Sequence, residues 1–194
     1  TTIFQRHVTQ TLTCCAINRV GTAGAATQIV GSPMVWGGYL EQRLIYNSSP
    51  IFHQTKHPRN IHLGLDFWTE QETAVYAPIA GKVHSFSDNA GFGDYGPTII
   101  LSHASEGLIF HSLYGHLARH SLQGLEIGQH VAQGAKIGML GKATENGEWP
   151  PHLHFQLIRD MQGYSGDYPG VCSPRDLPFY SENCPDPVTF YIPI

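Results

Sequence analysis

Turn-forming residues interrupt this chain too often for long helices to form. Its 194 residues include 21 glycines and 13 prolines, and no long run of Ala, Glu, Lys and Leu stands between them. Glycine and proline weaken helix interiors and mark turns, so the sequence predicts a β-rich domain with many tight corners. A chain of this length can bury one good-sized core, and we therefore expect a single domain.

Short apolar or alternating segments between turn residues predict where the strands lie. The pattern begins near Tyr39 with the alternating segment YLEQRLIY, and strands are expected within residues 73–87, 96–105, 108–117, 124–141 and 151–160. Residues 1–35 show no sustained period and are expected to form an irregular N-terminal arm. Residues 36–160 are expected to form the main domain, and the Pro-, Gly- and Tyr-rich residues 161–194 a C-terminal wrap that belongs to it.

Charge and hydropathy exclude two classes of partner. The formal net charge is −4, and no basic stripe is present that would contact phosphates, so nucleic acid is not expected as a partner. No segment approaches the roughly 20 apolar residues of a membrane span, and the first residues do not resemble a signal peptide. Four cysteines are too few for a disulfide-built scaffold; pairing of Cys172 with Cys184 is left open.

Histidine is the residue type that most needs a chemical explanation. The chain has 12 histidines against 11 lysines and arginines together. Two of them stand two residues apart in WPPHLHFQL, residues 149–157. Because strand side chains alternate between faces, His152 and His154 are expected to share one face. Taken alone, such a pair is more often structural than functional.

Two further motifs supply partners for this pair. In HLGLD, His62 and Asp66 would lie about 13 Å apart on a straight strand, but a bend at Gly64 brings them together. In LYGHL, His116 follows a glycine near the end of a strand. His62, Asp66 and either histidine of the 152/154 pair make a two-histidine, one-carboxylate zinc site with the fourth position left for water. The remaining histidines can then act on that water and on an oxyanion, as amide hydrolysis requires.

The ordered set HLGLD, VYAPIAGKV, YGHL, GQHVAQGAKIGMLG and PHLHFQL resembles the lysostaphin/LytM-type zinc metalloendopeptidase family over residues 39–159. The resemblance implies an all-β, mainly antiparallel sheet or sandwich, related to the barrel-sandwich hybrid fold, for the domain at 36–160. It implies one zinc ion bound by His62, Asp66 and His154, and a catalytic pair, His116 and His152. The implied reaction is hydrolysis of peptide bonds in cell-wall cross-bridges (peptidoglycan) or other small-residue-rich peptides by a zinc-activated water.

The chain also departs from the common pattern of this family. Residues 87–98 are longer than the usual glycine turn and are expected to alter the groove wall, and Trp149 is expected to narrow the cleft. The tail resembles a variant found inside larger polypeptides beside kinase-like and aminotransferase-like domains. The expected location is extracytoplasmic for a stand-alone cell-wall enzyme and cytoplasmic for a piece of such a fusion. An inhibitory role for residues 1–35 stays open.

Two alternative interpretations of the sequence assign it to other classes of protein. Catalytically silent relatives bind peptide or activate an enzyme, but they usually lose a metal position, whereas all five residues stand in this sequence. Lipoyl and biotinyl carriers resemble part of the pattern, yet they present a lysine at a hairpin tip. Lys82 and Lys136 are not so placed, so this resemblance concerns the fold and not the function.

Overall fold

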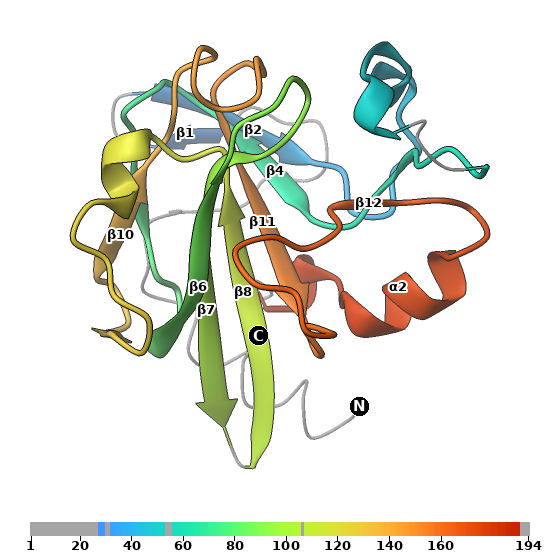
Figure 1. The fold of residues 1–194 in the computed structure, drawn as a ribbon. Coiled ribbons are helices and arrows are strands. Elements are labelled where there is room, and N and C mark those ends of the chain that lie inside the picture. Colours follow the sequence, from blue (N-terminus) through green and yellow to red (C-terminus); the bar gives the residue numbers. More distant parts are fainter. Residues whose placement is uncertain (1–26, 30–31, 53–55, 106, 191–194) are drawn as a thin grey trace.

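The computed structural model describes residues 27–29, 32–52, 56–105 and 107–190, and most of the regular elements in them are strands (Figure 1). The strands are β1 (Thr27–Ile29), β2 (Ser32–Gly37), β3 (Ile61–His62), β4 (Leu65–Trp68), β5 (Ala74–Tyr76), β6 (Gly81–Asn89), β7 (Gly96–Ser105), β8 (Leu108–Gly115), β9 (His130–Val131), β10 (Lys136–Met139), β11 (His152–Ile158) and β12 (Val171–Cys172). The helical segments are α2 (Leu177–Asn183) and the 3-10 turns η2 (Leu44–Ser48), η3 (Pro50–Phe52), η4 (Arg119–Leu122) and η5 (Pro187–Phe190).

Strand β11 lies inside a large antiparallel sheet. The sheet has the strand order β1-β2-β4-β11-β8-β7-β6-β9, and its pairings are antiparallel. Two further pairs, β10 with β5 and β12 with β3, form separate short sheets. The all-β, mainly antiparallel fold expected from the sequence is therefore confirmed.

The alternation of side chains along β11 separates a hydrophobic core from a polar face. Leu153, Phe155 and Leu157 belong to the larger core, together with Tyr114 of β8. His152, His154 and Gln156 occupy the alternate positions and face the other side of the sheet. All seven residues of β11 are buried, so the polar face of this strand is covered by other parts of the chain.

Most of the expected strands are present, and the differences are local. Strands β5, β7, β8, β9, β10 and β11 lie within the ranges predicted for them, and β6 extends two residues beyond its range, to Asn89. Residues 39–46 instead contain an isolated bridge between Gln42 and Ile61 and the start of η2. Figure 1 shows η2 and η3 standing apart from the large sheet. Leu40 and Tyr46 pack against other parts of the chain, whereas Leu44 and Ile45 are exposed, so the apolar alternation of this segment does not mark a strand.

The predicted irregular arm differs from the structure at its end. Residues 27–29 form β1, and Ser32–Gly37 form β2, which pairs with β4. That pairing depends on residues about 30 positions later in the chain, so no local pattern in the sequence predicts it. Residues 1–26 and 30–31 of the arm lie outside the described residues.

The predicted C-terminal wrap contains short regular elements. Strand β12 pairs with β3, and α2 follows it. Cys172 and Cys184 are free thiols and both are buried. Among the helices of the described residues, none is long and apolar enough to cross a membrane.

Candidate metal centre and active site

Strand register brings three of the predicted site residues together. His154 on β11 lies opposite Asp66 on β4, and His62 ends β3 just before the chain turns into β4. The turn contains Gly64, where an added Cβ would lie 2.7 Å from the carbonyl oxygen of Phe155 and 2.8 Å from His154 Nε2. Glycine is required because β11 passes so close to the backbone. The bend predicted between His62 and Asp66 is confirmed.

The donor atoms of these three residues converge on one point. His62 Nε2 lies 2.8 Å from His154 Nδ1 and 3.2 Å from Asp66 Oδ1, and His154 Nδ1 lies 3.1 Å from the same oxygen. The three residues are 1–3% exposed. Within the described part of the chain they form the group of histidine and acidic side chains able to hold a metal ion.

The second nitrogen of each imidazole has a partner that fixes its proton. His62 Nδ1 donates to the carbonyl oxygen of Gly38 at 2.9 Å. His154 Nε2 lies 2.9 Å from Gln156 Oε1, and the amide nitrogen of Gln156 donates to the carbonyl oxygen of Pro169 at 3.1 Å. Since a carbonyl only accepts, these contacts assign a proton to His62 Nδ1 and to His154 Nε2.

It follows that His62 Nε2 and His154 Nδ1 present lone pairs to each other and to the carboxylate. Burial alone would raise the pKa of Asp66, but the neighbouring histidines, His62 first and then His154, outweigh it and hold that pKa well below its usual value. Three electron-pair donors in mutual contact repel one another unless a cation lies between them. Two imidazoles and a carboxylate are a donor set that fits a divalent transition metal.

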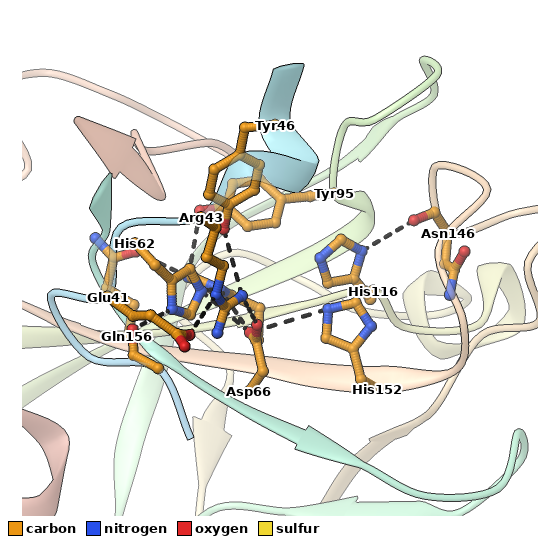
Figure 2. A network of polar contacts seen from close by, with 12 residues as sticks. Glu41, Arg43, Tyr46, His62, Asp66, Tyr95, His116, Asn146, His152 and Gln156 are labelled. Carbon is orange, nitrogen blue, oxygen red and sulfur yellow. Dashed lines mark hydrogen bonds and ion pairs between the residues drawn. The ribbon is translucent and has the colours of Figure 1, made fainter. Parts of the chain in front are cut away.

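The other two predicted site residues face each other beside this donor set (Figure 2). The rings of His116 and His152 have centroids 4.2 Å apart, and His152 Nε2 lies 3.9 Å from Asp66 Oδ1. His116 Nδ1 donates to the carbonyl oxygen of Asn146 at 2.9 Å, and His152 Nδ1 donates to that of Pro150 at 2.7 Å. These bonds leave the Nε2 atom of each neutral ring as a proton acceptor.

Burial keeps this pair of rings uncharged. It lowers the pKa of His116 well below the usual value, assisted by the nearby His152, and it also lowers the pKa of His152. His116 has a backbone φ of +62°, a left-handed conformation that is uncommon for residues other than glycine and is often found at functional sites. The fold therefore strains the chain to hold a neutral imidazole next to the donor set.

A cavity of about 770 Å³ opens over the five residues, all of which line it. Tyr46, Phe52 and Trp149 also line it; Tyr46 packs on Phe52 at 4.6 Å between ring centroids and on Trp149 at 6.3 Å. Tyr95 lines it too, with its ring 5.1 Å from that of His154. Trp149 and Tyr95, which belongs to residues 87–98, thus line the cleft, as expected from the sequence.

Residues 60–165 match the model of the family described as Peptidase family M23. The chain belongs to this family. The resemblance inferred from the five motifs is therefore confirmed. The individual roles of the five residues remain predictions.

Curated relatives of this M23 chain are longer proteins. An uncharacterized metalloprotease of Haemophilus influenzae is 31% identical over 123 residues, 61% of this chain and 24% of that protein. The DD-carboxypeptidase/endopeptidase Mpg of Neisseria meningitidis serogroup B is 31% identical over 126 residues, 62% of this chain and 26% of that protein. The aligned part thus spans about a quarter of each relative.

Among solved structures, the catalytic domain of lysostaphin from Staphylococcus simulans is similar to this M23 chain. It has 25% sequence identity and a TM-score of 0.46, with 75% of this chain and 91% of that chain covered.

Sequence reasoning missed Gln156, although it stands two residues after His154 and so shares its face. Replacing Gln156 with leucine removes the oxygen that accepts from His154 Nε2 at 2.9 Å and leaves that N–H only the longer contact with the Tyr95 hydroxyl at 3.4 Å. We expect the affinity for a divalent metal ion to fall by about 10–100-fold, measured by competition with a chromophoric chelator. Gln156→Glu keeps an acceptor for His154 Nε2 but loses the donor to the carbonyl oxygen of Pro169, so it separates the two contacts. Wild-type affinity in Gln156→Leu would contradict this role.

Proposed function

We propose that this M23 chain is a zinc-dependent endopeptidase. One observation carries the proposal: three lone pairs, from His62, Asp66 and His154, converge at the base of a cavity beside two neutral imidazoles. Family membership and the relative named as a metalloprotease support it. Zinc, when bound, supplies a Lewis acid that polarises the scissile carbonyl and makes a water molecule more acidic.

The chain's own residues hold and move the proton in this reaction. His116 and His152 are both uncharged and present Nε2 as an acceptor, so either one can take a proton from the attacking water. Once protonated, that ring becomes a donor, able to stabilise an oxyanion or to protonate the leaving amine. The carbonyl oxygens of Asn146 and Pro150 keep each ring in one orientation and tautomer throughout. No residue needs to form a covalent intermediate.

The proposed substrate is an extended peptide with small residues, such as a peptidoglycan cross-bridge. The cavity of about 770 Å³ has the sheet as its floor and loops and aromatic side chains as its walls, a shape that suits a slim chain. The relative named as a DD-carboxypeptidase/endopeptidase also favours a cell-wall peptide.

Metal content and peptide cleavage test this proposal together. We expect about one zinc ion per purified chain by mass spectrometry, cleavage of a glycine-rich peptide or of purified peptidoglycan, loss of cleavage with a chelator, and recovery when zinc is returned. A chain that binds no zinc even after addition would overturn the proposal. A chain that binds zinc and peptide but cleaves neither substrate would favour the silent, peptide-binding alternative.

A further inference from the structure

The carboxylate of Asp66 has a second buried partner on the side away from the histidines. Arg43 Nη1 contacts Asp66 Oδ2 at 2.5 Å, while Oδ1 faces the two imidazoles. The side chain of Arg43 is 14% exposed and that of Asp66 is 3% exposed, so solvent screens this ion pair little. Arg43 precedes the residues that match the family model, and no pattern in the sequence marks it.

Several contacts hold the guanidinium in this orientation (Figure 2). Arg43 Nε donates to Glu41 Oε2 at 2.8 Å, and the guanidinium carbon lies 5.6 Å from the centre of the Trp68 ring. Arg43 Nη2 lies against Gly38, where an added Cβ would be within 3 Å of it. The planar guanidinium of arginine can stack on an aromatic ring and pair with a carboxylate at the same time. The ammonium group of lysine does not reproduce this combination.

The same short segment reaches two members of the donor set. Gly38 accepts a hydrogen bond from His62 Nδ1 through its carbonyl oxygen, and Arg43 contacts Asp66 five residues later. Gly38 has a φ of +105°, which only glycine adopts readily, and it also leaves room for Arg43 Nη2. The segment thus orients one imidazole and one carboxylate at once.

We propose that Arg43 is a positioning residue that occupies Asp66 Oδ2 and so leaves only Oδ1 to face the metal. This inference rests on the metal site of the proposed function. With Oδ2 held, the carboxylate cannot rotate to offer both oxygens, and Oδ1 stays aimed at the two imidazoles. Asp66 then acts as an oriented, single-atom ligand, which preserves a position for water and substrate.

Three variants separate this role from general stabilisation. Arg43→Met removes both the charge and the fork, and Arg43→Lys keeps the charge with one donor group. Arg59→Met is the matched control, because Arg59 lines the same cavity and lies over an aromatic ring, Phe52, but donates to the carbonyl oxygen of Ile51. Each purified variant is compared with wild type for zinc affinity, for the visible absorption of the cobalt(II)-substituted protein, and for thermal unfolding.

For Arg43→Met we expect about 10–100-fold weaker zinc binding and a cobalt spectrum that indicates a changed coordination number. Arg43→Lys is expected to lie between Arg43→Met and wild type, and Arg59→Met to match wild type in both measurements. If Arg43→Met does not fold, Arg43→Lys carries the same comparison.

Wild-type zinc affinity together with a wild-type cobalt spectrum in Arg43→Met would overturn the positioning role and leave the proposed function intact. Equal changes in Arg43→Met and Arg59→Met would also overturn it, because the effect would then belong to the cavity and not to Asp66. A wild-type chain that binds neither metal would instead refute the proposed function, so the two failures are distinguishable.

Discussion

Alanine in place of His154 is expected to abolish both metal binding and peptide cleavage, whereas alanine in place of His152 is expected to abolish cleavage alone. His154 Nδ1 lies within 3.1 Å of the nearest atoms of His62 and Asp66, so its loss leaves two ligands, too few for a stable zinc site. His152 Nε2 stands 3.9 Å from Asp66 Oδ1, outside that cluster. Its loss should therefore spare the metal.

The measurement is zinc per chain by mass spectrometry beside kcat/KM on one peptide. For His152→Ala we expect about one zinc per chain and a rate lower by about 10²–10⁴-fold, the usual contribution of an acid or base group. His130→Ala is the control, because His130 is an exposed histidine on β9. Full zinc in His154→Ala, or loss of zinc in His152→Ala, would reverse the assignment of the two histidines.

The sequence predicts the face on which these histidines lie but not the division between them. Alternation alone places His152 and His154 together, and the structure confirms this. Which of the two meets Asp66 depends on the register of β11 against β4, in which His154 pairs with Asp66 and His152 pairs with Trp68. Register is set by contacts between segments more than 80 residues apart, so no local pattern in WPPHLHFQL contains it.

The surrounding polar residues differ in how far a sequence can reveal them. Gln156 follows His154 by two positions, so strand periodicity was enough to place it on the same face. Arg43 and Asn146 lie in loops, and their contacts depend on where the chain returns to the sheet. Tyr95 and Tyr114 look alike in sequence, yet Tyr95 lines the cavity whereas Tyr114 is a core residue, 1% exposed.

The second large effect is expected at His116, where the backbone conformation decides which variant is informative. Because His116 has a φ of +62°, alanine there adds backbone strain that would complicate any loss of activity. Asparagine tolerates this conformation better than most residues and has no group that can accept a proton from water at neutral pH. His116→Asn is therefore expected to fold and to retain the metal, while kcat/KM falls by about 10²–10⁴-fold.

Thermal unfolding, metal content and kcat/KM of His116→Asn, measured on one preparation, test this expectation. The ring of His116 lies 6.4 Å from that of His154, farther than from His152 at 4.2 Å, so the donor set should survive the change. His116→Gly provides a second variant that relieves the same strain and also lacks an imidazole. If both variants keep the metal and cleave within twofold of wild type, His116 takes no part in proton transfer, and its strained backbone requires a purely structural explanation. If both lose the rate and keep the metal, the imidazole itself is responsible, because the two replacements share only its absence.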